Sequence, residues 1–590
     1  MPGEPLFQHL HAAEQHFEHQ INILKGQSAR LIQATIPDKD MKTLILPFLS
    51  MASASLSPIT SADSFSLNPP CLAGSGTDYP VGPGQTYAAL SDIPWDNLGP
   101  GDTVRIHYRS TPYREKIVIR TSGTEQDPLR ICGVSGTNGE RPILDGNGAA
   151  NDPDDAAAYT TYPPMEGLAM ILIYNQDYEL KDSNITIDGL HIRNARNTFS
   201  YTRMDGSIDS YENGAACIRV QAGDNIIIRD NEIENCGSGV FTMSQGYNEA
   251  HLTRNILIEG NHIHGNGQAG SYLEHGSYIQ AIGAIYQYNR FGSNAAGAEG
   301  ASLKERVAGS VIRYNWFEGD SARFLDLVEV EDAAPWYIVA EYLDELGCTD
   351  IDNCPGIDPE RLQKVQEAEN LYRNTHVYGN FFDHIGSQTT AGSMVHYGWD
   401  NDISLAREGS LHFYNNTVSI REDLNDSWRF RLFDMRNNYG GTPRSRESIE
   451  AFNNIIYFRS ETPGASPAYL CMTNSGGTVN FGTNWISNYR QNENLAECYY
   501  GDTANAPTLN GLDSLIDGTG APAPIDTFLL TRDTPLVVGN AQTLPPGMKP
   551  VLHEYRAHQN RADRLSVNDL GAMEISGTSS YFIFADGFEQ

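Results

Sequence analysis

Residues 225–233 read NIIIRDNEI and residues 255–263 read NILIEGNHI, two copies of one pattern: apolar β-formers, a turn, an Asn and a second apolar strand. About nine copies lie between residues 184 and 484. When the copies are aligned, one column holds Leu190, Asn231, Asn261, Asn289, Asn315, Asn380, Asn416, Asn454 and Asn484. Such self-similarity predicts a solenoid, in which each repeat stacks on its neighbours.

The chemistry of the repeat favours a parallel β-helix. Asn tolerates the left-handed backbone region, so it suits a sharp bend between strands, and its amide can bond to the Asn stacked on it. Successive members of the column are 26 to 41 residues apart, except for one interval of 65. We expect each turn of the helix, here called a coil, to keep its core-facing strands and to release extra residues as loops.

The composition agrees with an all-β protein. The 590 residues are 40% hydrophobic, enough for a large core, whereas 55 Gly and 30 Pro leave little material for long amphipathic helices. The formal net charge of -34 disfavours nucleic acid and anionic membranes as partners, because both need a basic surface. An acidic ligand would need locally concentrated positive charge or a bridging divalent cation.

The eight cysteines suggest local pairs. Proximity in the sequence predicts Cys71 with Cys132, Cys217 with Cys236, Cys348 with Cys354, and Cys471 with Cys498. An even count with local partners is typical of an oxidising compartment, although free buried thiols are the alternative. No pair has the CxxC spacing of a structural zinc site.

An export signal is predicted at an internal position. Residues 41–62 read MKTLILPFLSMASASLSPITSA, with one Lys, an apolar run and then small residues, which is the layout of a secretory signal. Residues 1–40 are His- and Gln-rich, and we interpret them as an upstream extension. A membrane anchor is the alternative, but the run from Met41 to Met51 is too short to span a bilayer. We therefore expect a secreted or periplasmic protein.

Residues 63–150 are expected to form an N-terminal cap and the first coils. They contain VGPGQTYAALSDI from Val81 and PGDTVRIHYRSTPYREKIVI from Pro100. These segments resemble the opening of right-handed parallel β-helix proteins of the polysaccharide-lyase type. The resemblance implies a right-handed coil that is closed at one end by a short amphipathic helix.

The remaining chain is expected to continue the solenoid. Residues 151–505 should form the β-helix, interrupted at 333–373 by two short helices whose apolar residues recur at i, i+3 and i+4. Residues 506–590 should hold late coils, a C-terminal cap and a tail. The final FIFADGFE, Phe582–Glu589, resembles the end of many secreted gammaproteobacterial proteins.

Residues 272–332 contain several basic side chains in an otherwise acidic chain. Lys304 and Arg306 share one face of a strand, and Arg323 follows Lys304 by 19 residues, close to one coil. Residues one coil apart stack roughly 4.8 Å apart, so these side chains and His275 are expected to become neighbours. Breaking a uronide by β-elimination needs positive charge near the carboxylate, and neighbouring cations would lower the pKa of Lys304 so that it acts as a base. The alternative is surface ion pairing with Glu305, Glu318 and Asp320.

These residues resemble polysaccharide lyase family six, which includes chondroitinase B and alginate lyases. The resemblance implies that Lys304 is the base, Arg323 the acid, and Glu299 one ligand of a calcium ion that neutralises the uronate carboxylate. The second calcium-binding Glu of the family, two residues earlier, is Gly297 here. The missing oxygen ligand would then come from Asn261 or Asn289.

The preferred expectation is therefore a monomeric, secreted enzyme that cleaves an acidic polysaccharide by β-elimination. The first alternative is a glycoside hydrolase that uses two carboxylates among Asp326, Glu329, Glu331 and Asp332. The second is a non-catalytic glycan-binding or adhesin-like surface, because a fold alone does not decide function. The residues expected to contact sugar are His396, Trp399 and Tyr288.

Overall fold

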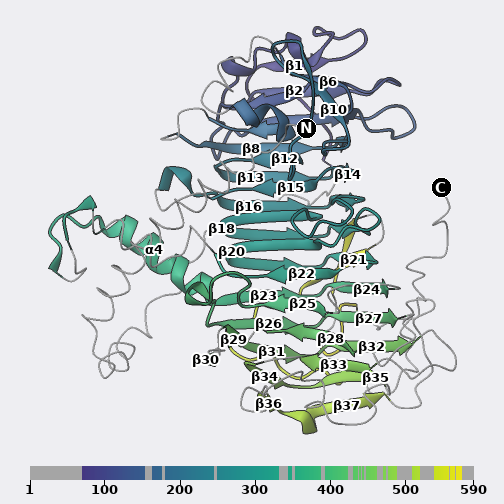
Figure 1. Cartoon of the computed structure of the whole chain (residues 1–590), viewed down its shortest axis with the longest axis vertical. Coiled ribbons are helices and arrows are strands. Elements are labelled where there is room, and N and C mark those ends of the chain that lie inside the picture. The colour runs from purple at the N-terminus through teal and green to yellow at the C-terminus, as the bar shows by residue number, and fades with distance from the viewer. Residues whose placement is uncertain are drawn as a thin grey trace, which may run out of the picture.

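The computed structural model describes residues 69–573 with breaks, so the predicted signal, the upstream extension and the tail lie outside the described residues. The breaks are 153–162, 176–179, 245–248, 331–342, 344, 349–352, 387–392, 423–428, 436–437, 440–441, 444–446, 461–468, 474–475, 488–507, 519–536, 557–558 and 565–566. Figure 1 shows a long stack of strands that lie side by side from β1 at one end to β37 at the other.

The chain winds through three parallel ladders, here called faces 1, 2 and 3. Face 1 contains β3 (Ile117–Ile119), β7 (Ala169–Ile173), β12 (Ala216–Val220), β15 (Ser238–Thr242), the first halves of β18 (Ser277–Gln287) and β20 (Ala301–Arg313), β22 (Arg323–Leu327), β25 (Ser393–Tyr397), β28 (Arg429–Asp434) and β33 (Tyr469–Thr473).

Face 2 follows face 1 in each coil. It contains β1 (Asp78–Val81), β2 (Thr103–His107), β4 (Leu129–Val134), β8 (Asp182–Asp188), β13 (Gly223–Arg229), β16 (Arg254–Glu259), the second halves of β18 and β20, β23 (Asn374–Tyr378), β26 (Ser410–Tyr414), β31 (Ser448–Phe452), β34 (Thr478–Phe481) and β36 (Thr508–Asn510).

Face 3 completes the coil. It contains β5 (Ile143–Asp145), β9 (His191–Arg193), β14 (Glu232–Glu234), β17 (His262–His264), β19 (Arg290–Phe291), β21 (Trp316–Gly319), β24 (Phe381–Gly386), β27 (Thr417–Glu422), β32 (Ile455–Ser460), β35 (Asn484–Ser487) and β37 (Leu515–Gly518). All pairings along the three ladders are parallel, so the prediction of a parallel β-helix is confirmed.

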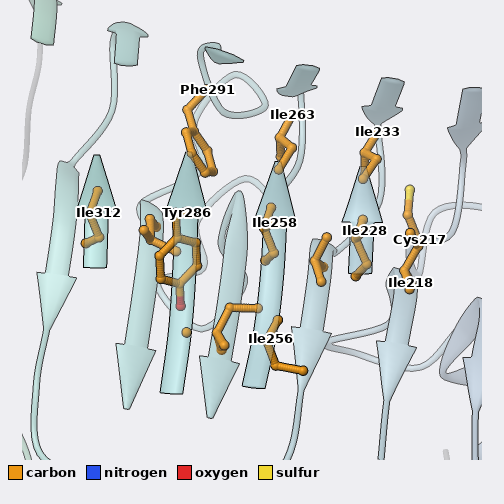
Figure 2. Packing of buried hydrophobic residues seen from close by; sticks show 14 of the residues in the cluster. Cys217, Ile218, Ile228, Ile233, Ile256, Ile258, Ile263, Tyr286, Phe291 and Ile312 are labelled. Carbon is orange, nitrogen blue, oxygen red and sulfur yellow. The ribbon is translucent and has the colours of Figure 1, made fainter. Parts of the chain in front are cut away.

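The core lies inside the prism that the three faces enclose. Strand residues alternate between core and surface, so a column of apolar side chains such as Ile228 and Ile258 stacks from coil to coil. Figure 2 shows these residues beside Ile233 and Ile263, which enter the same core from face 3. Burial of such columns is the main stabilising term of the fold.

Two long strands, β18 and β20, turn from face 1 to face 2 without a loop. The corner falls at Gly283 and Gly309, whose φ angles are +81° and +86°. Glycine adopts this backbone region without the steric cost that a Cβ imposes. The corner places the first half of each strand on face 1, which carries the candidate site.

The Asn column forms a continuous ladder at the bend between faces 2 and 3. Nδ2 and the backbone N–H of Asn261 both donate to Oδ1 of Asn289, at 3.0 and 2.9 Å, and the pattern repeats down to Asn484. The predicted ladder is thus confirmed, but from Asn231 to Asn454 the left-handed residue is the one before each Asn. At Tyr288 and Tyr314 that residue has φ of +56° and +55°.

Three of the four predicted disulfides are present: Cys71–Cys132, Cys217–Cys236 and Cys348–Cys354. The fourth predicted pair involves Cys498, which lies outside the described residues. These bridges are compatible with an oxidising, extracellular compartment. Within the described part of the chain, no helix is long and apolar enough to cross a bilayer.

The helical insertion is observed in its second half as α4 (Pro359–Tyr372), while the first predicted helix lies largely outside the described residues. The Asp358 side chain caps α4 by accepting from the backbone of Glu360. The end of α4 packs against Ala308 near the corner between faces 1 and 2, and Figure 1 shows the rest of the helix running outward from the prism.

Several short strands and 3-10 turns lie outside the three faces. Near the N-terminus, the 3-10 turns η1 (Leu90–Asp92) and η2 (Trp95–Asn97) bury Leu90 and Trp95 in the main core. The other short strands are β6 (Ala149–Ala150), β10 (Ser200–Thr202), β11 (Ile208–Ser210), β29 (Asn438–Tyr439), β30 (Thr442–Pro443), β38 (His553–Arg556) and β39 (Asn560–Asp563). The other short 3-10 turns are η4 (Pro163–Gly167), η5 (Glu249–His251), η7 (Ile403–Leu405) and η10 (Leu512–Ser514).

Candidate active site

One column of polar side chains crosses five successive strands of face 1. Direct register partners join Tyr278, Lys304, Asp326, His396 and Asp434. Neighbouring parallel strands lie roughly 4.8 Å apart, so residues that are distant in the sequence become adjacent side chains. The column passes through the segment in which the sequence predicted a site.

Lys304 is the centre of this column and is only 8% exposed. Its Nζ lies 2.8 Å from Oδ2 of Asp326 and 2.6 Å from Oδ2 of Asp400, which belongs to the loop after β25. Burial opposes the ammonium charge, but the two carboxylates outweigh it and raise the pKa of Lys304 above its ordinary value. Arg306 lowers this pKa, as predicted for a neighbouring cation, but the predicted net lowering was wrong because the two carboxylates outweigh it.

Arg306 connects the column to the loop after β25. Its Nη2 donates to Oδ1 of Asp400 at 2.8 Å, its Nη1 to the carbonyl of Glu329 at 2.9 Å, and its Nε to the hydroxyl of Tyr278 at 2.9 Å. The Glu329 carboxylate accepts the backbone N–H groups of residues 400–402, each at 2.8 Å. Glu329 thus fixes the loop that presents Asp400, so it has a structural task here.

Arg323 lies at the start of β22, beside Ala301 rather than beside Lys304. The sequence predicted one coil between Lys304 and Arg323, but the observed coil is 22 residues long and brings Asp326 opposite Lys304. Arg323 still reaches the column, since its Nη1 lies 3.4 Å from Oδ1 of Asp326. Its Nη2 lies 3.6 Å from Oδ2 of Asp434.

His396 is fully buried between these groups. Its Nδ1 lies 2.6 Å from Oδ1 of Asp326 and 3.1 Å from Nη1 of Arg323. A carboxylate only accepts hydrogen bonds, so we assign the proton of His396 to Nδ1. Together with Lys304, this hydrogen bond keeps Asp326 ionised: burial alone would raise the pKa of Asp326, but the surrounding cations hold it well below its usual range.

His275 supports the column from the preceding coil. Its ring is buried and packs edge-on against Tyr278, with centroids 5.3 Å apart. Its Nδ1 accepts the backbone N–H of Ala301 at 3.0 Å. Burial, followed by the charge of Lys304, lowers the pKa of His275 to about 3, so the ring is neutral and serves as a wall of the site.

Two residues predicted to contact sugar are placed elsewhere. Trp399 is only 2% exposed, so it does not offer an open ring face for stacking on a pyranose. Tyr288 directly follows β18, stacks with Tyr314 and packs in a cluster with Val551. Neither buried ring is open in this structure for the predicted contact with sugar.

The residues suggested for calcium do not form one site. Asn261 and Asn289 are fully buried, and their side-chain oxygens each accept hydrogen bonds within the ladder. Glu299 is exposed on the loop that precedes β20, with Gly297 two residues before it. Calcium takes six to eight oxygen ligands. This donor set does not supply them, so we route no chemical step through calcium.

The sequence alone did not identify Tyr278 or Asp434 as part of the site. Tyr278 is the register partner of Lys304 one coil earlier, and Asp434 is the partner of His396 one coil later. Strand register would have identified both residues, because each occupies an outward-facing position on face 1. The register depends on the length of each loop, which the repeat pattern did not fix.

Comparisons with known proteins concern the fold. The family model described as "Right handed beta helix region" matches residues 168–325. No curated protein matches the sequence.

Three solved structures illustrate the similarity. An alginate lyase from Paenibacillus sp. strain FPU-7 is 13% identical, with a TM-score of 0.34 over 64% of this chain and 94% of that one. Pectate lyase Pel9A is 11% identical, with a TM-score of 0.37 over 85% and 96%. A pectin methylesterase from Aspergillus niger is 9% identical, with a TM-score of 0.23 over 72% and 90%. The fold rests on the family match and on the three hydrogen-bonded ladders: the chain is an all-β, right-handed parallel β-helix.

Proposed function

We propose that the chain is an exported enzyme that cleaves an acidic polysaccharide by β-elimination at the column around Lys304. The observation that carries this proposal is the convergence of Lys304, Arg306 and Arg323 on one part of face 1 in a chain of net charge -34. The carboxylates of Asp326, Asp400 and Asp434 lie beside these cations and hold their side chains on face 1, where the N–H groups can donate to a uronate carboxylate.

The Arg323 guanidinium is suited to bind the uronate carboxylate. Its contacts with Asp326 and Asp434, at 3.4 and 3.6 Å, are longer than the 2.7–2.9 Å typical of strong charge-assisted hydrogen bonds. Its Nε donates to the Ser393 hydroxyl at 3.2 Å, so the donors left for a further carboxylate are the second N–H groups of Nη1 and Nη2. A guanidinium does not release its proton in proteins, so we give Arg323 this task instead of the acid role that the family resemblance implied.

Two neighbouring side chains can move the protons. The neutral amine of Lys304 removes the C5 proton, the electron pair forms the C4–C5 double bond, and the C4–O4 bond breaks. The leaving oxygen then takes a proton from the Tyr278 hydroxyl. That hydroxyl accepts from Arg306 and Gln280, and no acceptor among the described residues takes its own proton. Its proton is thus available to the substrate.

Tyr278→Phe tests the acid role. The substitution keeps the ring against His275 but removes the hydroxyl proton, so we expect kcat to fall about 10²-fold, within the range of general acids. KM should change little because Arg323 is untouched. Initial rates over a range of substrate concentrations measure both constants, and a kcat within twofold of the wild type would exclude Tyr278 as the acid.

The pH profile tests the base role. Lys304 accepts a proton only in its neutral form, and its pKa is raised by Asp326 and Asp400 against the effect of burial. Below that pKa the neutral fraction grows tenfold per pH unit, so kcat/KM should rise about tenfold per unit between about pH 7 and pH 9. A flat profile over this range would contradict the base role, because Lys304 stays protonated between pH 7 and pH 9 when its pKa is raised.

Hydrolysis is the second candidate, because Asp326 and Asp400 both contact Nζ of Lys304. Their nearest oxygens are therefore at most about 5.4 Å apart, which is compatible with the separation of the two carboxyl groups in retaining glycosidases. Hydrolysis, however, also needs a protonated carboxylic acid. Burial would raise both pKa values, yet the cations hold those of Asp326 and Asp400 below the ordinary range. This favours elimination.

The experiment is an assay of the purified protein on pectate, alginate, chondroitin and dermatan, with and without added calcium. Elimination produces an unsaturated uronate that absorbs in the ultraviolet, and we expect this absorbance without stimulation by calcium. New reducing ends without the absorbance would favour the hydrolase. Binding with neither signal would favour a non-catalytic glycan-binding protein and contradict the proposal.

A further inference from the structure

Face 3 carries a cluster of imidazoles and carboxylates that the proposed function does not use. Glu232 and His262 are register partners on β14 and β17, and His264 lies two residues further along β17. Ile233 and Ile263 point into the core, so the residues that flank them point outward (Figure 2). We propose that Glu232, His262 and His264 bind a divalent transition-metal ion, with zinc as the best match.

The three side chains already have the spacing of metal ligands. One ligand atom from each lies within 4.8 Å of the others. Nε2 of His264 is 3.5 Å from Oε1 of Glu232, which is too long for a strong hydrogen bond. Two ligands bound tetrahedrally to one zinc ion at roughly 2.0–2.1 Å lie roughly 3.4 Å apart. The observed spacing therefore fits a shared ion.

Further side chains surround the ligands. His262 stacks on His264, with ring centroids 4.0 Å apart. Oε2 of Glu234 lies 3.9 Å from Nδ1 of His264, and Oε1 of Glu234 lies 2.9 Å from Nε2 of His191. A carboxylate beside the second nitrogen of a metal-binding imidazole is a usual feature of zinc sites, where it orients the ring.

The ligand chemistry selects the class of ion. Calcium and magnesium prefer oxygen ligands, whereas imidazole suits zinc, copper and nickel. Two His and one Glu provide three protein ligands and leave a fourth position for water on the outside of face 3. Arg290 is the register partner of His262. Its guanidinium forms an ion pair with Glu318 at 2.6 Å, so its positive charge is directed to a carboxylate of the next coil.

The test is calorimetric titration of the full-length, metal-stripped protein with zinc chloride. We expect the wild type to bind one more equivalent of zinc than either His264→Ala or Glu232→Gln. The His-rich residues 1–40 are present in all three proteins, so the difference isolates this site. Cobalt(II) should give the visible absorption of a four-coordinate ion in the wild type, and both variants should lose it.

His412→Ala is the matched control. His412 stacks on His376 on face 2 at 4.7 Å, but this pair belongs to no three-ligand group among the described residues. This variant should bind zinc as the wild type does. Equal zinc stoichiometry in the wild type and His264→Ala would overturn the proposal. None of these variants alters face 1, so polysaccharide cleavage should be unchanged and the two proposals can fail separately.

Discussion

Replacement of Lys304 by alanine is expected to lower the rate of uronate elimination about 10²- to 10⁴-fold, the contribution typical of a general acid or base. Lys304 also separates Asp326 and Asp400, which it contacts at 2.8 and 2.6 Å. Without the ammonium group, two ionised carboxylates face each other and repel an acidic substrate. We therefore expect KM to rise as kcat falls, and steady-state kinetics measure both effects.

Lys364→Ala provides the control for this substitution. Lys364 lies on α4, its side chain is 53% exposed, and its contact with Glu360 at 3.6 Å is a surface ion pair of little energetic value. Its kinetics should match those of the wild type. A Lys304→Ala protein that melts at the wild-type temperature and retains its rate within a few-fold would show that the column is not the active site.

Asn315→Ala is expected to destabilise the protein by about 3–5 kcal/mol, because it removes a fully buried member of the ladder. The Asn315 Oδ1 accepts two hydrogen bonds from Asn289, and the two N–H groups of its Nδ2 are shared among the carbonyls of Tyr286 and Arg313 and the side chain of Asn380. Alanine leaves these buried partners unsatisfied on both adjacent coils. Chemical denaturation measures the free energy of unfolding.

Asn213→Ala is the matched control, since Asn213 is an exposed Asn that accepts one hydrogen bond from Asn197. Its free energy of unfolding should stay within about 0.5 kcal/mol of the wild type. If Asn315→Ala were as mild as Asn213→Ala, the ladder would be a by-product of the fold and not a source of its stability.

Much of the fold could be predicted because the repeat has a physical cause. The column from Asn231 to Asn484 marks one bend in each coil, and the bend requires an amide that bonds upward and downward along the stack. The sequence also predicted three disulfides and α4, which follow from spacing and from helical periodicity. It did not predict that bulky residues such as Tyr288 would take the left-handed backbone region.

The site was harder to predict because it depends on register. The pattern gave Lys304 and Arg323 as cations of adjacent coils, but a difference of three residues in coil length put Asp326 opposite Lys304. Asp400 reaches the column from a loop whose backbone N–H groups are bound by Glu329. Neither the length of a coil nor the path of such a loop is encoded in the repeat.

The most direct test of the central claim is to digest alginate or pectate in water labelled with heavy oxygen and to weigh the products by mass spectrometry. Elimination breaks the C4–O4 bond without adding water, so we predict unsaturated products that carry no label and that disappear with Lys304→Ala. Saturated products that carry one heavy oxygen per cleaved bond, at the new reducing end, would contradict the account, because they would show that the column around Lys304 does not perform β-elimination.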